Sequence, residues 1–421
     1  MLKASALYMV IIIALVIGVI CSSLIASAYF YRAQYQKTAR YSLLQNNLTS
    51  GINILLAGDD TTYEQEKTFS LFQTETDTVT INRIFWGLYD IGTVKAFIQK
   101  DTLYQSLSIA HTLDSGKWAV LYLPDDERPL AVSGKTRIKG NVFIPPAGVN
   151  QAYIDNQAYS GDKRLIIGKI QNSQKTLPAL NTARLEKFKE LLYQKHDTTA
   201  ILSGDTLQNS FLQPTRVFSF RKKVTTLQNI CLKGNIILFS DTTLTIDSTA
   251  SLTNVLVFAR SIIVKSGFRG QCQLYATDTI GVGQRAQFSY PSCLGILRFG
   301  AITGKPTEAK INLQSNCSFS GLIFTYEKAK NVFAPLIDIG KNTKIKGQVY
   351  SQGLLEFHDQ AEVDGSVFTA TFLYQTSFTR YENYINNTTL DESLLSPYYL
   401  TSDLVPVATS VKKTLQWLDL K

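Results

Sequence analysis

Two similar stretches, more than 200 residues apart, constrain the fold of this chain more than any other feature. Residues 130–144 read LAVSGKTRIKGNVFI, and residues 337–351 read IDIGKNTKIKGQVYS. Both have apolar residues at positions 0, 2, 8 and 12, a small residue or Thr at position 6, and Gly at position 10. The same template, kept more loosely, fits segments that begin at Leu244, Ile262, Ile280, Ile311 and Leu355. Seven copies indicate a repeated structural unit.

The spacing of the copies indicates the type of repeat. From Leu244 onward, successive copies begin 18, 18, 31, 26 and 18 residues apart, so the base period is 18 and two turns carry insertions. Alternating apolar positions at this period predict a β-solenoid with three short faces per turn and apolar columns that stack inward. The Gly or Asn of position 10 is expected at a corner with positive φ. We expect an inserted element at about residues 147–233, with a helix at residues 181–194.

The N-terminus predicts one long helix. Residues 4–31 carry no charged side chain, and the apolar core, residues 6–30, is long enough to cross a bilayer. Beyond it, Leu44, Leu48, Ile52 and Leu55 recur at helical spacing on one face. We therefore expect a helix over about residues 5–57. A plain signal anchor and a cleaved signal peptide, with ASA at residues 26–28 as the cleavage site, are the alternatives.

A short leader, MLKA, followed by SALYMVIII, resembles the N-terminus of type IV pilin-like proteins. The likeness is greatest to minor pilins and K-type pseudopilins. It implies cleavage by a prepilin peptidase between Ala4 and Ser5, and packing of the helix against other pilin-like subunits. Two positions depart from the usual pattern. Ala4 stands where the family usually has Gly, and Met9 stands where most major pilins have Glu, an absence typical of K-type members.

The order of elements after the helix agrees with that resemblance. Alternating residues from Val79 to Ile109, with a tight turn at Lys100 and Asp101, predict an antiparallel meander that covers the apolar face of the helix. The fold class is therefore mainly β with a long N-terminal α-helix: a pilin-like helix and meander, then a β-solenoid with an inserted element. The expected parts are residues 1–31 (leader and transmembrane segment), 32–125 (amphipathic helix and meander), 126–372 (solenoid) and 373–421 (loop and cap).

Cysteine and histidine usage argues against a metal centre. None of the five Cys forms a C-x-x-C pair, and the chain has three His. We therefore predict no metal site and no cofactor. In an exported domain, four of the cysteines could form two disulfides, whereas in a reducing compartment they would be buried apolar fillers. These four are Cys231, Cys272, Cys293 and Cys317.

The basic residues of the repeat form a candidate polyanion-binding face, because they occupy the outward positions of the alternation and the chain has a formal net charge of +9. The alternative is ordinary solvation and protection of strand edges by Lys. The residues are Lys135, Arg137, Lys139, Lys341, Lys344 and Lys346.

The sequence offers one weak candidate for catalysis. No Gly-rich phosphate loop, G-x-S-x-G or H-E-x-x-H occurs. A polysaccharide hydrolase or lyase on a solenoid needs paired carboxylates on one face. The residues that fit are Glu356, His358, Asp359, Glu362 and Asp364, although the alternation turns several of them outward as solvating charges. We predict that the chain is not an enzyme and that no small molecule is its substrate.

We therefore expect a non-enzymatic structural or adhesive component of a pilus-like or secretion-type filament. It would be a single-pass membrane protein whose bulk is extracytoplasmic, in the periplasm or at the cell surface, with the membrane and other pilin-like subunits as partners. One alternative is a membrane-anchored solenoid enzyme acting on polysaccharide. The other is a bactofilin-like scaffold in the cytoplasm, which the positive-inside rule favours because Arg32, Lys37 and Arg40 follow the apolar run.

Overall fold

The structure is a computed structural model, and it describes residues 2–58, 65–73, 77–154, 156–194, 204–300, 307–329 and 331–420. About half of the chain is strand, and one long helix opens it, so the prediction of a mainly β chain with a long N-terminal helix is confirmed. The chain divides into two compact units. Unit 1 comprises residues 1–83, 92–106 and 420–421, and unit 2 comprises residues 84–91 and 107–419.

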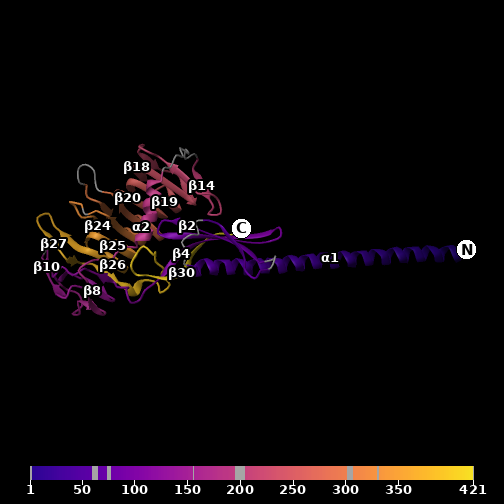
Figure 1. The fold of residues 1–421 in the computed structure, drawn as a ribbon, viewed down its shortest axis with the longest axis horizontal. Coiled ribbons are helices and arrows are strands. Elements are labelled where there is room, and N and C mark those ends of the chain that lie inside the picture. Colours follow the sequence, from indigo (N-terminus) through magenta and orange to yellow (C-terminus); the bar gives the residue numbers. More distant parts are fainter. Residues whose placement is uncertain are drawn as a thin grey trace. The chain divides into compact units, whose positions relative to one another are not determined.

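Helix α1 (Leu2–Ala57) is continuous over 56 residues (Figure 1, indigo). It contains no proline, and it ends where the N–H of Gly58 donates to the carbonyl of Ile54 at 2.9 Å. None of its most apolar window is buried, and by length and composition the helix could cross a membrane, as a signal sequence could. The predicted processing site, Ala4 and Ser5, lies in this helix, but its side chains fall outside the described residues.

The second half of α1 packs against that part of a sheet which belongs to the same unit. The four residues predicted to share a face, Leu44, Leu48, Ile52 and Leu55, are all buried. Gly51 lies on this face as well, and a Cβ at that position would come within 2.7 Å of the Val94 side chain. The absence of a side chain at Gly51 therefore allows the helix to approach the sheet closely.

The sheet beside the helix has the strand order β1-β2-β3-β4-β30. Connections of two residues join β2 to β3 and β3 to β4, so these strands form the predicted antiparallel meander. The C-terminal strand, which the sequence left as a strand or a cap, pairs with β4, and Thr112 and Thr409 are joined there by a hydrogen bond of 2.6 Å. The bounds are β1 (Lys67–Ser70), β2 (Thr78–Trp86), β3 (Tyr89–Ile98), β4 (Asp101–Leu113) and β30 (Ala408–Leu420).

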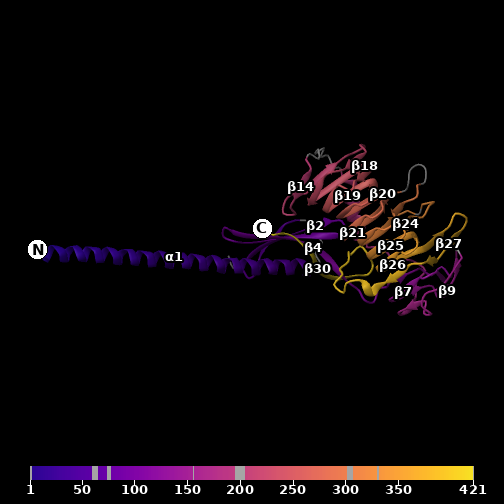
Figure 2. The ribbon, with the colours of Figure 1, turned by 180° about the vertical axis from the view of Figure 1, so that it is seen from behind.

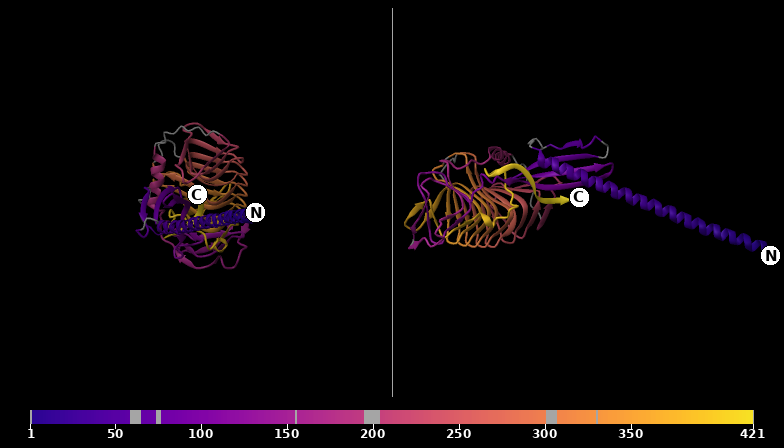
Figure 3. Two further views of the ribbon diagram at one scale, coloured as in Figure 1. Left: turned by 90° about the vertical axis from the view of Figure 1, so that its right-hand side faces the viewer. Right: turned by 90° about the horizontal axis from the view of Figure 1, so that it is seen from below.

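Unit 2 is built from parallel strands that pair from turn to turn around one apolar core (Figure 3). The predicted first residues of the copies are in register: Leu244 pairs with Ile262, Ile262 with Ile280, Ile280 with Ile311, Ile311 with Ile337, and Ile337 with Leu355. The strands are β18 (Ile236–Ile246), β19 (Ser251–Val264), β20 (Arg269–Val282), β21 (Gln287–Arg298), β22 (Lys310–Leu313), β23 (Ser318–Glu327), β24 (Leu336–Ile339), β25 (Lys344–Phe357) and β26 (Glu362–Gln375).

The first copy of the repeat lies at the far end of this stack. Ile138 pairs with Leu390 on one side and with Ile166 on the other, and Leu390 pairs in turn with Val363. The neighbouring turn is therefore made from two separate segments, β5 with β29. The strands at this end are β5 (Leu121–Tyr122), β6 (Leu130–Ser133), β7 (Arg137–Lys139), β8 (Val142–Ile144), β9 (Val149–Gln151), β12 (Ile166–Ile167), β13 (Ile170–Asn172), β28 (Tyr384–Asn386) and β29 (Thr389–Asp391). Smaller elements there are β10 (Tyr153–Ile154), β11 (Gln157–Ala158), β27 (Arg380–Glu382) and the 3-10 helix η1 (Glu392–Leu394).

The opposite end of the stack is formed by β14 to β17, which follow the first copy of the repeat in the chain and precede all the others. Leu232 pairs with Leu207 on one side and Leu252 on the other, and Leu244 pairs with Thr225. Figure 2 shows β14 and β18 at this end, away from β7 and β9. Parts of the segment predicted to be an insertion thus supply strands at both ends. The strands here are β14 (Thr206–Asn209), β15 (Arg216–Ser219), β16 (Thr225–Leu227) and β17 (Cys231–Gly234).

Residues with positive φ mark corners of the turns. At template position 10, φ is positive at Gly140, Asn254, Gly321, Gly347 and Gly365, as predicted, but not at Cys272 or Tyr290 in the copies that begin at Ile262 and Ile280. A second column, which the sequence did not predict, has positive φ five residues into the five copies from Ile262 onward: Gly267, Arg285, Asn316, Asn342 and Gln360. Asn254 also shifts the register, so that Val257 pairs with Leu274. The template placed Leu256 in the inward column, whereas it packs in a second apolar cluster.

Helix α2 (Thr182–Tyr193) covers that second cluster. The predicted helix is present, and the Asn181 side chain caps it by accepting from the N–H of Ala183 at 3.0 Å. Phe188 is fully buried and its ring lies 4.9 Å from that of Tyr275. Arg184, also buried, donates to Asp90 at 2.7 Å and to Asp403 at 2.6 Å. An ionic triad therefore fixes the helix in unit 2.

Candidate functional site

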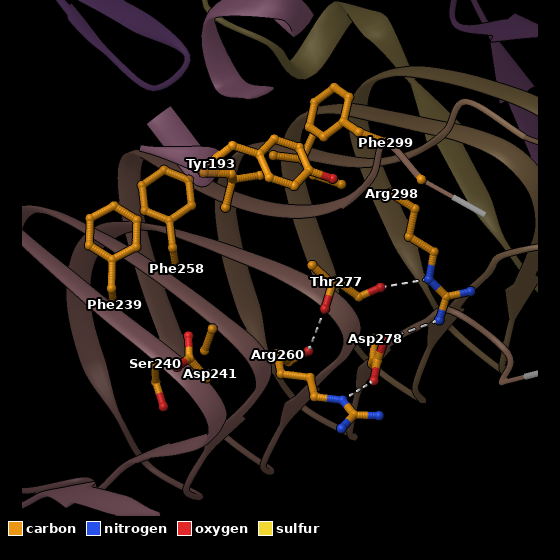
Figure 4. A pocket seen from close by; sticks show the side chains of 14 residues that line it. Tyr193, Phe239, Ser240, Asp241, Phe258, Arg260, Thr277, Asp278, Arg298 and Phe299 are labelled. Atoms are coloured by element: carbon orange, nitrogen blue, oxygen red, sulfur yellow. Dashed lines mark hydrogen bonds and ion pairs between the residues drawn. The ribbon is translucent and has the colours of Figure 1, made fainter. Parts of the chain in front are cut away.

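A pocket of about 490 Å³ lies in unit 2, between the end of α2 and strands β18 to β21 (Figure 4). Phe239 and Phe258 stack on one side of it, with ring centroids 5.2 Å apart. Tyr193 and Phe299 lie on the other side. Aromatic rings therefore form part of the walls, and polar and charged side chains form much of the rest.

Three of the four charged side chains that line this pocket, Arg260, Asp278 and Arg298, are held in ion pairs, and the fourth is Asp241. Arg260 donates to Asp278 at 2.7 Å. Arg298 donates to the Thr277 carbonyl at 2.6 Å and to Glu327 at 2.9 Å, and its side chain is 5% exposed. These contacts use the guanidinium groups in holding adjacent strands together, so the pocket offers less charge to a ligand than its composition suggests.

The six predicted basic residues lie on or just before β7 and β25, the strands that carry the two copies of the similar stretches at residues 130–144 and 337–351. Glu362 pairs in register with Lys344, and Asp364 with Lys346, so acidic turns lie between the two basic stretches. Ion pairs join Arg137 and Lys139 to Asp391 (3.6 and 3.9 Å), Lys341 to Asp359 (3.5 Å), and Lys344 to Glu362 and Asp364 (3.0 and 3.2 Å). Lys135 and Lys346 are exposed. The face therefore carries acidic side chains on β26 and β29, between the two basic stretches.

The five predicted acid–base residues separate into two groups. Asp359, Glu362 and Asp364 form the lysine pairs just described. Glu356 and His358 lie together, and they are joined by Asp338, which is not among the residues predicted from the sequence. His358 Nε2 is 2.9 Å from Asp338 Oδ1, and Lys310 Nζ is 2.8 Å from Asp338 Oδ2. The structure thus assembles a compact cluster of two carboxylates, an imidazole and an ammonium group.

Electrostatics distinguishes the members of this cluster. Burial, and then the neighbouring Asp338 carboxylate, raise the pKa of Glu356. Burial acts to raise the pKa of Asp338 too, but hydrogen bonds from His358 and Lys310 outweigh it and the net pKa is lowered. The hydrogen bond to Asp338 raises the pKa of His358. Asp338 is therefore the shared anionic acceptor, and Glu356 is the carboxylate whose charge is least compensated.

The register explains how Asp338 could have been found. Asn312, Asp338 and Glu356 each stand one residue after the first residue of a copy, and they pair in sequence: Asn312 with Asp338, and Asp338 with Glu356. The template therefore placed these side chains in one outward column. Lys310 precedes a copy rather than belonging to it, and no spacing signal pointed to it.

All five cysteines are free thiols. Cys272, Cys293 and Cys317 are buried, and Cys21 on α1 is exposed. Burial raises the pKa of the Cys272 thiol, which lowers its reactivity. The arrangement agrees with the filler role, one of the two roles considered for these residues.

Comparison with known proteins gives no match to a family model, to a curated protein or to a solved structure. The candidate sites therefore rest on the geometry of this chain alone.

Proposed function

We propose that the chain is a membrane-anchored, non-enzymatic subunit of a pilus-like or secretion-type filament, of the type IV pilin-like class. The observation that carries the proposal is the division of α1 into two halves. Its first half is apolar and is exposed over residues 6–30, and its second half buries Leu44, Leu48, Ile52 and Leu55 against a meander. One half is then suited to lipid or to neighbouring helices, and the other carries a folded unit.

The parallel stack of unit 2 would be a β-solenoid with a base period of 18 residues, displayed outside the membrane. The register steps support this interpretation, since the pairs from Leu244 to Ile280 advance 18 residues at a time and longer steps contain extra chain. A stack of this kind offers a long, rigid face for adhesion or for contact with a neighbouring subunit. A polyanion would meet the exposed Lys135 and Lys346 first, because the other four basic residues already have acidic partners.

The test of the pilin-like assignment is the N-terminus of the mature protein. When the protein is co-expressed with a prepilin peptidase and purified from membranes, we expect N-terminal sequencing to give Ser5 as the first residue. When it is expressed without the peptidase, we expect Met1. Substitution of Ala4 by Leu should block the cleavage. An intact Met1 in the presence of the peptidase, or a start at Tyr29, would contradict the proposal.

Packing of α1 against other subunits can be tested with the cysteine that the helix already contains. Cys21 is exposed, whereas the three most buried cysteines lie in the stack. We expect oxidative crosslinking in membranes to give crosslinked species that are lost in Cys21→Ala. Crosslinking that persists in this variant would mean that the contact is elsewhere.

The cytoplasmic scaffold alternative is an outcome of a sidedness experiment. Ser377 lies at an exposed tip, next to Phe378, which is 96% exposed. Labelling of Ser377→Cys by a membrane-impermeant maleimide on intact cells supports the extracytoplasmic assignment, with the unsubstituted protein as the control. Labelling only after lysis would support a cytoplasmic, bactofilin-like scaffold. The polysaccharide-enzyme alternative is favoured by no specific observation, because Asp359, Glu362 and Asp364 are occupied by lysines.

A further inference from the structure

The cluster at Asp338 joins two successive turns of the stack. Asp338 lies on β24 and Glu356 on β25, and the two residues are partners in the strand register. His358 follows β25 directly, and its N–H donates to the Ile339 carbonyl at 2.9 Å. The three side chains therefore leave the backbone from adjacent, hydrogen-bonded positions, which fixes their Cα atoms relative to one another.

The polar atoms of these side chains converge. One carboxylate oxygen of Asp338, one of Glu356 and one imidazole nitrogen of His358 all lie within 4.8 Å of one another. Glu356 is 8% exposed, and the Asp338 side chain is 13% exposed. The His358 side chain is 38% exposed, so the cluster has one open side toward solvent. Two nearly buried carboxylates so close together need a compensating cation.

Lys310 supplies only part of that compensation. Its ammonium contacts Asp338 Oδ2, the oxygen opposite the one that faces His358. The side of Asp338 that faces Glu356 and His358 is therefore where a further positive charge would be held.

We propose that Asp338, Glu356 and His358 bind one divalent transition-metal ion of the zinc type. Zinc takes carboxylate oxygens and imidazole nitrogens at about 2.0–2.2 Å, which separates the ligand atoms of a tetrahedral site by about 3.3 Å. The observed spacing, from 2.9 Å for the His358–Asp338 pair up to 4.8 Å, reaches that geometry by side-chain rotation. An imidazole ligand disfavours calcium and magnesium, which prefer oxygen ligands.

The role of the ion would be to clamp two turns together. Its ligands come from β24 and from the end of β25, and Lys310 from the preceding turn would hold Asp338 in position through its second oxygen. With three protein ligands, the fourth position on the exposed side is left for water. The binding free energy then adds to the stability of the folded stack.

The test uses the full chain in detergent, stripped with chelator and titrated with zinc by calorimetry. We expect one zinc per chain, and an increase of about 2 °C or more in the midpoint of thermal unfolding at saturation. His358→Gln and Asp338→Asn should weaken binding at least about tenfold, whereas Lys310→Met, which removes only the contact to the second oxygen of Asp338, should weaken it by a smaller factor. Asp359→Asn, which breaks the nearby Lys341 pair, is the matched control and should leave the affinity unchanged.

Binding of cobalt in place of zinc separates this site from the cysteines. We expect visible absorption bands typical of oxygen and nitrogen ligands, without the thiolate charge-transfer band. Three results would overturn the proposal: no bound zinc, equal affinity in the unsubstituted protein and His358→Gln, or a thiolate band. Circular dichroism of each metal-free variant shows whether it is folded. If His358→Gln does not fold, Asp338→Asn takes its place in the comparison of affinities.

Discussion

The glycines at template position 10 are required by close contact between turns. At Gly347 φ is +133°, and a Cβ there would lie 2.2 Å from the carbonyl oxygen of Gly321 in the preceding turn. Gly365 stands in the same relation to Gly347, at 1.9 Å. Glycine at this position of the repeat is therefore required by the close approach of neighbouring strands as well as by the positive φ.

We predict that Gly347→Ala lowers the free energy of unfolding by about 3 kcal/mol, since left-handed strain and a backbone clash act together. Gly281→Ala is the control, because a Cβ there meets nothing within 4 Å, and it should change the free energy by less than about 0.5 kcal/mol. Chemical unfolding of the full chain in detergent, followed by circular dichroism, measures both. Equal effects of the two substitutions would contradict the role assigned to Gly347.

His111 gives the chain a predictable dependence on pH. It is buried, and its Nδ1 lies 2.8 Å from the Thr409 carbonyl. Burial lowers its pKa from 6.5, and this outweighs the opposing effect of Asp403. The unfolded chain therefore binds the proton more readily. The stability is fully present above pH 6.5 and is lost as the pH falls through the lower pKa of the folded state.

We expect His111→Gln to reduce this acid-side loss between about pH 5 and 7. The measurement is the difference in denaturation midpoint between variant and unsubstituted protein at each pH. Taking the difference matters because His358, whose pKa is raised, acts with the opposite sign, its contribution being lost as the pH rises. A difference that does not change with pH would show that His111 is not the titrating group.

At the scale of elements, α2 depends on a single buried cation. Arg184 is 4% exposed, and it contacts Asp90, Asp403 and the Gly87 carbonyl. Burial alone would lower the pKa of Arg184, but the two carboxylates more than compensate and the pKa is raised. The helix is thus joined to residues 84–91 and to the C-terminal part of unit 2 by one side chain.

Arg184→Met should lower the free energy of unfolding by about 3–5 kcal/mol, because the buried Asp90 loses its ion pair with Arg184. Adding Asp90→Asn and Asp403→Asn removes the uncompensated charges and should recover part of the loss. Denaturant unfolding of the three proteins gives the comparison. A triple variant no more stable than Arg184→Met would assign the effect to lost packing instead.

The elements differ in how far the sequence could predict them. The buried face of α1 could be predicted, because a helix repeats about every 3.6 residues and its buried positions are apolar. These positions are Leu44, Leu48, Ile52 and Leu55. The starts from Leu244 to Leu355 gave the register of the stack for the same reason. The turn formed by β5 and β29 could not be predicted, since its two parts are short and come from distant segments. The role of Lys310 could not be predicted, because it lies outside the repeated template and no periodic pattern points to it.

At the scale of the whole chain, the two ends of the stack should respond separately to damage. Leu390 is fully buried between Val363 and Ile138, and Leu252 is fully buried near the opposite end. We predict that Leu390→Asp deprotects residues 130–144 and 362–375 in hydrogen exchange, while residues 244–282 keep their protection. Leu252→Asp should give the reverse pattern. Uniform loss in both variants would mean that the stack unfolds as one unit.

The turn formed by β5 and β29 also determines when during synthesis the strands of unit 2 can complete their pairing. Residues 130–144 leave the ribosome early, but the strand that Ile138 and Arg137 pair with on one side, β29, is made about 250 residues later. At translation rates of about 5–20 residues per second, the interval is on the order of 10–50 seconds. For that time Ile138 has only the later-made Ile166 as a strand partner. A ribosome stalled before residue 389 would therefore hold every template strand and β5, but the turn that joins the two ends of the repeat would still lack its β29 half.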